Sequence, residues 1–274
     1  MWILIVLLSL AALAALLFLL YLLILVRPRK RAPNDPALLC AYAHRGLHGN
    51  GIPENSLAAF ERACARGYGI ELDVQLSRDG TVMVFHDDTL ARMTGDTARV
   101  RERDAAELQA LRLLDSEQTI PTFCEVLARV NGRVPILIEL KGEDFDTSLC
   151  GAVAACLSDY TGAYCIESFN PLLLRAMQKQ LPNAWYGLLY TNVCRDKKKR
   201  SVLNVALTAM ALNAVARPDF IAYNEKDRAT LPVKITTRLY RAARMVWTVR
   251  SEESLDTARA RNESPIFEGI ESMM

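Results

Sequence analysis

Strand-like and helix-like segments alternate through most of this chain, and that alternation limits the folds open to it more than any other feature. Short apolar runs recur, and amphipathic stretches with helix-capping residues separate most of them. Strands that are joined by helices form parallel sheets, and roughly eight such units close into a barrel. We therefore predict an α/β fold, a TIM (β/α)8 barrel. The expected strands are 38–44, 70–76, 81–85, 134–141, 164–169, 184–190, 219–223, 245–249 and 265–270.

The length of the chain fits one such barrel. It has 274 residues, and the part that follows its hydrophobic N-terminus is about 245 residues long, close to the roughly 250 of a typical TIM barrel. We predict that residues 40–274 form this single domain. The expected helices are 53–66, 104–114, 122–130, 171–180, 202–216, 231–243 and 252–261. Because only four residues follow the last expected strand, we expect the helix that normally closes the barrel to be missing or minimal.

Residues 1–26 carry no charge and are rich in Leu, Ile and Ala. About 20 apolar residues are enough to cross a bilayer. The run is too long for the core of a signal peptide, lacks a basic segment before it, and is followed by bases rather than by a small-residue cleavage site. We predict an uncleaved, single-pass transmembrane helix that anchors the protein in a membrane.

Residues 27–39 then form a basic juxtamembrane linker that begins RPRKR. Under the positive-inside rule this cluster lies in the cytoplasm, so we expect the barrel on the cytoplasmic side and the N-terminus outside. The cluster could also contact anionic lipid head groups or serve only as a stop signal. Because the linker is short, the barrel should lie close to the membrane.

The composition excludes some classes of function. A net charge of +2 argues against a protein that binds nucleic acid, and no basic groove with interleaved aromatic residues is apparent. The seven cysteines are odd in number and lack CxxC spacing, which favours reduced thiols in a reducing compartment. A second basic run, 195–200, follows an expected strand. It could be a solvated loop, or it could contact a membrane or a phosphate.

Chemically useful side chains gather between residues 41 and 95. Strand 70–76 alternates in period two, so Glu71 and Asp73 share one face. Two carboxylates so close would repel each other unless a hard divalent cation binds them. His44 and His86 follow neighbouring strands and can exchange protons near neutral pH, and Arg45 offers a planar fork for phosphate. These are the parts of a phosphodiester hydrolase.

The order of these residues resembles the HR…ExD…H signature of the glycerophosphodiester phosphodiesterase family. The segment PENS at 53–56 resembles a further element of that family, and so do the segments around 120–127, 136–141, 168–171 and 246–249. The likeness covers roughly residues 40–270. It implies a small insertion after the third strand, at about residues 88–120. It also implies metal-dependent hydrolysis of glycerophosphodiesters to glycerol 3-phosphate and an alcohol, in glycerophospholipid metabolism, with Mg²⁺ or Ca²⁺ as the cation.

The resemblance also implies roles for single residues. His44 and His86 become the general acid and base, Glu139 joins Glu71 and Asp73 as the third metal ligand, and Arg45 binds phosphate. For three further residues, alternatives stay open. Lys141 contacts the phosphate or the metal site, or it only pairs with Glu139; Glu54 reaches the site or only favours a helix start; Trp247 lines the pocket or only packs in the core.

Two other functions fit the same residues. The anchor makes membrane lysophospholipids plausible substrates, in which case the protein would be a lysophospholipase D. A catalytically silent, membrane-tethered binding module is the second alternative, although its site would be expected to lack at least one of these side chains. The substrate is a small-molecule or lysolipid phosphodiester in either enzymatic case.

Overall fold

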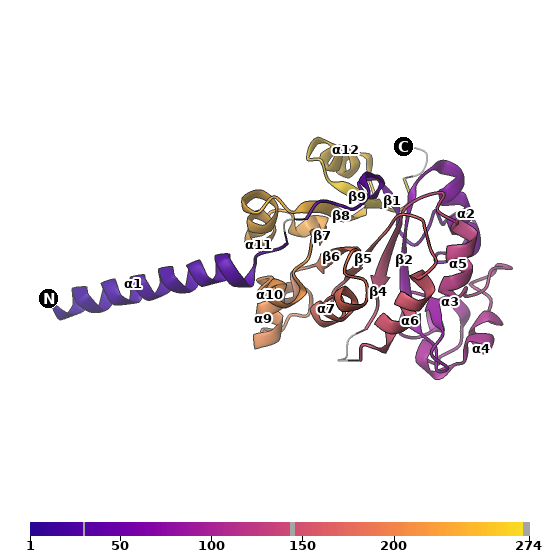
Figure 1. Ribbon diagram of the computed structural model, residues 1–274, viewed down its shortest axis with the longest axis horizontal. Helices are drawn as coiled ribbons and strands as arrows, with labels where there is room; N and C mark the ends of the chain where they lie inside the picture. The colour runs from indigo at the N-terminus through magenta and orange to yellow at the C-terminus, as the bar shows by residue number, and fades with distance from the viewer. Residues whose placement is uncertain (30, 143–145, 271–274) are drawn as a thin grey trace.

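A computed structural model describes residues 1–29, 31–142 and 146–270. Within them, eight parallel strands form a closed barrel, because β1 pairs with both β2 and β9. Helices surround it, and the TIM barrel prediction is confirmed (Figure 1). The barrel strands are β1 (Tyr42–Ala43), β2 (Gly69–Leu76), β4 (Ile136–Leu140), β5 (Tyr164–Ser168), β6 (Trp185–Tyr190), β7 (Phe220–Asn224), β8 (Ala243–Val249) and β9 (Ser264–Phe267).

The expected strand 81–85 is not part of the barrel. It forms β3 (Val82–Val84), which pairs with β2 in the antiparallel direction. The turn between the two strands is only five residues long and includes Gly80 with a φ of 81°. Such a short turn can reverse the chain, whereas a parallel pairing needs a crossover of about a dozen residues or more. His86 therefore follows a hairpin strand that lies outside the closed sheet.

After β3, the chain forms a compact lobe before it returns to the barrel. This lobe contains α3 (Ala91–Thr94), the short 3₁₀ helix η3 (Val100–Glu102) and α4 (Ala105–Gln109). Its buried residues, between positions 83 and 120, form a hydrophobic cluster of their own. The expected helix 104–114 ends earlier than predicted, but its capping box of Asp104 and Glu107 is present. The equivalence of this lobe to the insertion of the family stays a prediction.

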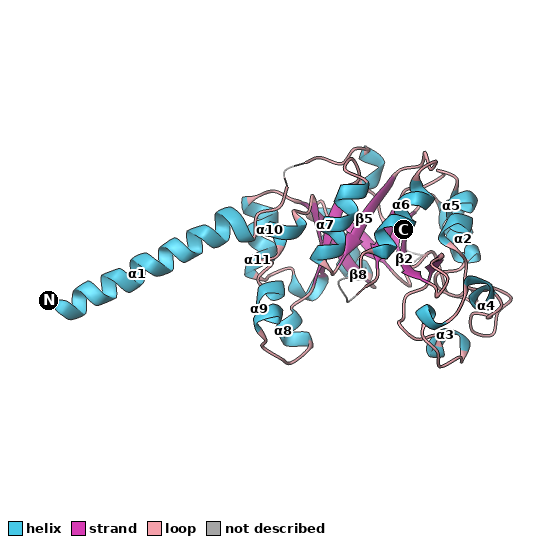
Figure 2. Ribbon diagram, turned by 60° about the horizontal axis from the view of Figure 1, so that its bottom comes forward, coloured by secondary structure: helices cyan, strands magenta, loops and turns pink. Residues whose placement is uncertain are grey.

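The remaining helices cover the outside of the barrel (Figure 2). Helix 202–216 was predicted as one element, but the chain there forms two short helices, and helix 231–243 ends at 239. The first strand is also shorter than expected, because Leu38 lies in a 3₁₀ turn. The bounds are η2 (Pro36–Leu38), α2 (Leu57–Arg66), α5 (Phe123–Val130), α6 (Ser148–Leu157), α7 (Pro171–Gln180), α8 (Val193–Asp196), α9 (Val202–Thr208), α10 (Asn213–Ala216), η4 (Glu225–Asp227), α11 (Leu231–Lys234), η5 (Ile235–Leu239) and α12 (Glu252–Ala260).

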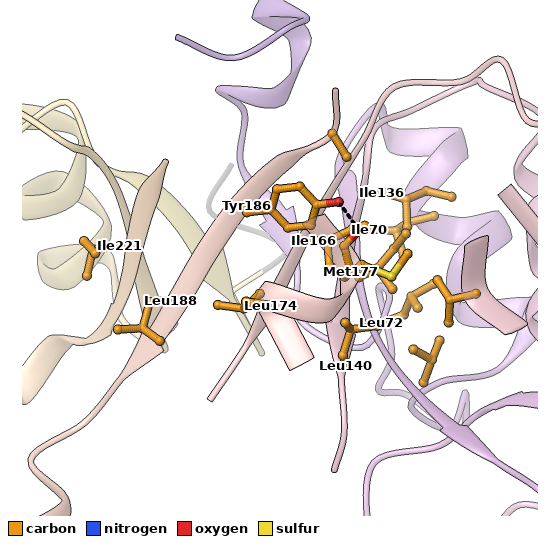
Figure 3. Packing of buried hydrophobic residues seen from close by; sticks show 14 of the residues in the cluster. Ile70, Leu72, Ile136, Leu140, Ile166, Leu174, Met177, Tyr186, Leu188 and Ile221 are labelled. Atoms are coloured by element: carbon orange, nitrogen blue, oxygen red, sulfur yellow. Dashed lines mark hydrogen bonds between the residues drawn. The ribbon is translucent and has the colours of Figure 1, made fainter. Parts of the chain in front are cut away.

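The alternation of side chains along each strand divides the core into two parts. Outward-facing residues such as Ile70, Leu72 and Ile136 pack against the helices (Figure 3). Inward-facing residues fill the half of the barrel at the amino ends of the strands. Trp185 and Phe220 lie there, with ring centroids 4.4 Å apart. Since polar residues follow these interior residues towards the carboxyl ends of the strands, the apolar plug forms the floor of the site.

One apolar helix projects away from the barrel (Figure 1). α1 (Trp2–Leu20) continues into the π-helix η1 (Tyr21–Leu25), and together they have a mean hydropathy of 3.1 over the most apolar window. The helix is long and apolar enough to cross a membrane, and an N-terminal signal sequence has the same properties.

Three hydrogen bonds connect the end of this helix to the barrel, and we call this group of contacts the joint. The hydroxyl of Tyr21 donates to the carbonyl of Ala209 at 2.8 Å, and Asn213 donates to the carbonyl of Val26 at 2.8 Å. The hydroxyl of Tyr240 donates to the carbonyl of Leu22.

Two bases of the predicted linker also form hydrogen bonds or ion pairs with the barrel. Arg29 donates to Gln178 at 2.8 Å, and Arg31 lies 3.3 Å from the carboxylate of Asp219. Lys30 of the predicted linker, and residues 143–145 and 271–274 of the predicted barrel domain, lie outside the described residues.

Candidate active site

Three buried carboxylates meet at the carboxyl ends of two neighbouring strands. Glu71 and Asp73 are alternate residues of β2 and so share its inner face, as predicted. Glu139 on β4 is the direct cross-strand partner of Asp73. One carboxylate oxygen from each residue lies within 4.8 Å of those of the other two.

The electrostatics of this group follow from its burial. Burial, together with the charges of Asp73 and Glu139, raises the pKa of Glu71 well above its ordinary value. Burial also raises the pKa of Glu139 to about 7. Burial alone would raise the pKa of Asp73 too, but the positive charges of Lys141 and its neighbours outweigh it and lower that pKa. The three carboxylates therefore repel one another, and a cation among them would relieve that repulsion.

Lys141 occupies the edge of the carboxylate group. Its ammonium nitrogen lies 2.7 Å from Glu139 and 3.0 Å from Asp73. It therefore pairs with Glu139 and also with Asp73, and its role towards a phosphate stays a prediction. The donor set of the group consists of oxygen atoms alone, which is what hard divalent cations prefer. Glu71, Asp73 and Glu139 fit such a cation by chemistry and by spacing.

His44 follows β1 and is held by a carboxylate from the far end of the chain. Its Nδ1 atom lies 3.1 Å from Glu268, which follows β9. The hydrogen bond from His44 and the nearby charge of Arg250 lower the pKa of Glu268 to about 2. Since an ionised carboxylate can only accept, the Nδ1 atom of His44 carries the proton of this bond. The Nε2 atom is left to exchange protons with another group.

His86 follows β3 and has an equivalent partner. Its Nδ1 atom lies 2.6 Å from Asp87. Burial lowers the pKa of His86, although the charge of Asp73 opposes this shift. Asp87 also accepts hydrogen bonds from Arg92, and Arg92 in turn donates to Glu54. Both histidines therefore have the same chemical arrangement, a ring oriented by a carboxylate.

Arg45 connects these groups. Its guanidinium donates to Glu54 at 2.8 Å and lies 3.7 Å from Asp73, while its backbone N–H donates to Glu71 at 2.8 Å. The φ of Arg45 is 55°, in the left-handed region that most side chains avoid. Glu54 thus reaches the site through Arg45 and Arg92, beyond any effect on the helix start.

An aromatic pair lies at the ends of two other strands. Trp247 on β8 and Phe169 after β5 meet edge to face, with ring centroids 5.7 Å apart. The indole N–H of Trp247 donates to the carbonyl of Ala222 at 3.0 Å, so the ring is held in place. Phe169 is exposed and Trp247 is half-buried, which leaves an apolar surface next to the polar group.

The described geometry agrees with a match to a family of known proteins. The model of the glycerophosphoryl diester phosphodiesterase family matches residues 44–267, which is more than half of the chain. The chain belongs to this family. Residues His44 and Glu268 lie at or beside the two ends of the matched segment, so the match covers the carboxylate group and both histidines.

Several members of the glycerophosphoryl diester phosphodiesterase family are similar to the chain. A glycerophosphodiester phosphodiesterase of Caldanaerobacter subterraneus is 34% identical over 164 residues, which are 54% of this chain and 65% of that protein. The crystal structure of a glycerophosphodiester phosphodiesterase from Thermotoga maritima is 26% identical, with a TM-score of 0.66, and the match covers 85% of this chain and 96% of that one.

A second solved structure shows likeness of fold alone. It is an Oleispira antarctica phosphodiesterase in complex with the product sn-glycerol-3-phosphate, with a TM-score of 0.69 and 22% identity, and the match covers 83% of this chain and 92% of that one. The match with the curated relatives covers only part of the length of each of those proteins. The chain spans about half to two thirds of the length of the first relatives it matches.

Five residues that the structure brings into the candidate active site were not identified from the sequence. Glu268 and Asp87 orient the histidines, Arg92 joins Asp87 to Glu54, and Asn55 donates to Asp73 at 2.9 Å. Glu167 is buried on β5, beside Glu139. Its position could have been found, because Cys165 and Glu167 repeat the alternation of Leu137 and Glu139.

Proposed function

We propose that this protein hydrolyses glycerophosphodiesters to glycerol 3-phosphate and an alcohol, with a divalent cation as cofactor. The observation that carries the proposal is the arrangement of two histidines, each hydrogen-bonded through Nδ1 to a carboxylate, around a cluster of three buried carboxylates. Membership of the family supports it independently. The barrel domain 40–274 would carry this activity.

In this proposal His44 and His86 are the general acid and base. One removes the proton of the attacking oxygen, and the other donates a proton to the departing alcohol. Glu268 and Asp87 hold the two rings in the tautomer that leaves Nε2 free for this exchange. Arg45 would offer its guanidinium to the phosphoryl oxygens, and Lys141 would add a second positive charge.

Glu71, Asp73 and Glu139 would hold the cation. When bound, the cation supplies positive charge that stabilises the phosphoryl oxygens as negative charge develops on them. Mg²⁺ and Ca²⁺ both prefer oxygen ligands, so either fits the donor set. Trp247, with Phe169 beside it, would line the pocket next to the alcohol or acyl part of the substrate.

We also propose that residues 1–26 anchor the protein in a membrane, with residues 27–39 as the linker. The observation in favour is the charge-free helix that projects from the barrel. The bases that follow it suggest that the barrel lies on the cytoplasmic side. With such an anchor, lysophospholipids in the same membrane are the second class of substrate, and a lysophospholipase D is the second candidate function.

The release of choline tests both candidates. The full chain, purified in detergent, would be given glycerophosphocholine or lysophosphatidylcholine, with Mg²⁺, with Ca²⁺ or with a chelator. We expect metal-dependent release of choline and glycerol 3-phosphate from the soluble diester. A preference for the lysolipid would favour the lysophospholipase D. No release from either substrate by a folded protein would leave the binding module.

Variants of the histidines test the mechanism. His44→Ala and His86→Ala should each reduce turnover to the background rate, because each removes one of the two proton-transfer groups. His48→Ala is the control, since among the described residues no carboxylate forms a hydrogen bond with the Nε2 atom of this third histidine. Substantial turnover by either of the first two variants would contradict the assignment.

A further inference from the structure

Exposed apolar side chains gather on the side of the barrel next to the N-terminal helix. Outside residues 1–25, the described part of the chain exposes nine large hydrophobic side chains, and five of these lie between residues 202 and 239. Val202, at the start of α9, is 91% exposed. An outer helix of a barrel normally turns such residues towards the core. The five residues are Val202, Leu203, Val205, Leu231 and Leu239.

Basic side chains surround these apolar ones. Residues 197–200, with the sequence KKKR, immediately precede α9 and are all exposed. Arg238 and Arg241 are exposed beside Leu239. Two acidic side chains beside these bases, Asp196 and Asp227, already pair with Arg195. The surface formed by 197–205 and 231–241, which we call the basic-apolar surface, therefore has a positive charge.

This surface lies directly beside the joint. Tyr21 donates to Ala209, the residue that follows α9, and Tyr240, which follows η5, donates to Leu22. Both views show α9 and α11 on the side of the barrel from which α1 projects (Figures 1 and 2). The two halves of the basic-apolar surface thus flank the end of the helix.

The length of α1 indicates where the basic-apolar surface would lie relative to a bilayer. The 19 residues of α1 span about 28 Å at 1.5 Å per residue, close to the roughly 30 Å of the hydrocarbon core of a bilayer. If α1 spans this core, the residues of η1 lie at the level of the head groups. α9 has seven residues and is only about 10 Å long, so its exposed end stays near that level.

We propose that the basic-apolar surface docks on the membrane that α1 spans. Val202, Leu203 and their apolar neighbours insert between the head groups, and the bases at 197–200 contact anionic lipids. This inference rests on the anchoring role proposed above for residues 1–26. It gives the second basic run of the sequence, 195–200, a role in membrane contact; the alternative stated above was a solvated loop.

Docking would also set the position of the candidate active site. α8 and α9 follow the carboxyl end of β6, so they belong to the same face of the barrel as the histidines and carboxylates. One rim of that face would then touch the bilayer. A lipid head group could reach the site from this rim without leaving the membrane.

Quenching of tryptophan fluorescence by brominated lipids tests the proposal. The full chain would be placed in nanodiscs of phosphatidylcholine and phosphatidylglycerol, with bromine near the carbonyl end of the acyl chains. The Trp2→Phe variant provides the background for Leu203→Trp. Leu114→Trp is the matched control, because Leu114 is also an exposed leucine but lies beside Met93 of α3, on the far side of the barrel.

We expect the tryptophan introduced at position 203 to be quenched several times more than the one at position 114. Replacing the four bases at 197–200 by Glu in the same variant should reduce this quenching to the level of the control. Equal quenching at the two positions would overturn the docking. The difference in quenching between the wild type and Trp2→Phe reports on the anchor separately. If Trp2 is quenched and the tryptophan at position 203 is not, the anchoring is supported and the docking is wrong. If Trp2 is not quenched either, both are wrong.

Discussion

Replacing Glu268 by Gln removes the negative charge next to His44 and keeps the shape of the side chain. The hydrogen bond between them is 3.1 Å long. A hydrogen bond to a charged group contributes about 1.5–3 kcal/mol. Because the side chain of Glu268 is 27% exposed, the lower part of that range applies, about 1.5–2 kcal/mol. At about 1.36 kcal/mol for each factor of ten, Glu268→Gln should lower kcat roughly 10- to 30-fold.

The assay is choline release from glycerophosphocholine at saturating metal, with kcat and KM measured separately. KM should change little, because Glu268 acts on His44 rather than on the substrate. Arg250→Gln is the matched control, since Arg250 bonds to the same carboxylate oxygen of Glu268 at 2.8 Å. Its side chain is 61% exposed, and an exposed ion pair is worth about 1 kcal/mol at most, roughly a fivefold effect. Equal losses in both variants, or no loss in Glu268→Gln, would refute the orienting role.

Three further predictions follow from the same structure. Glu139→Gln should raise the metal concentration needed for half-maximal activity, whereas Glu167→Gln should not, because Glu167 lies outside the group of three carboxylates; a metal titration of activity measures this. The folded-state pKa of Glu268, about 2, lies below its ordinary value of 4.5, so its contribution to stability is complete above about pH 4.5 and is lost towards pH 2. The Tm of Glu268→Gln should therefore fall less than that of the wild type between these pH values, and equal falls would contradict the shift. Finally, the Cβ in Gly187→Ala would overlap the ring of Phe220 and should cost about 1–3 kcal/mol of unfolding free energy, whereas Gly151→Ala on α6 meets no atom within 4 Å and should be neutral or stabilising in the same denaturant titration.

Local patterns were sufficient to predict much of the fold. The alternation of Ile70, Glu71, Leu72 and Asp73 predicted that Glu71 and Asp73 share one face of the strand, and their carboxylate oxygens do lie within 4.8 Å of each other. Helix 53–66 was also predicted, and α2 begins within it, where the hydroxyl of Ser56 caps the helix by accepting from the backbone N–H of Ala59. These features depend on a few neighbouring residues, so a short stretch of sequence contains all the necessary information.

Contacts between distant parts of the chain were not predictable in this way. His44 and Glu268 are 224 residues apart, and they meet only because β1 and β9 are neighbours in the closed barrel. The break between α9 and α10 also depends on tertiary structure, since Asn213 bonds to Val26 near the N-terminus. The antiparallel direction of β3 could have been inferred from the short turn before it.

The hairpin that carries β3 leads from the closed ring into a lobe that has a hydrophobic cluster of its own. The eight-stranded ring holds the carboxylates, while His86 belongs to a lobe with its own small hydrophobic cluster and exposed ion pairs, such as Arg78 with Asp104 and Arg112 with Glu117. Such pairs stabilise little. A lobe of this kind can open at a lower free energy than the whole fold. Warming would then separate His86 from Asp73 while the ring stays closed, so catalysis would cease before the protein melts and would return on cooling.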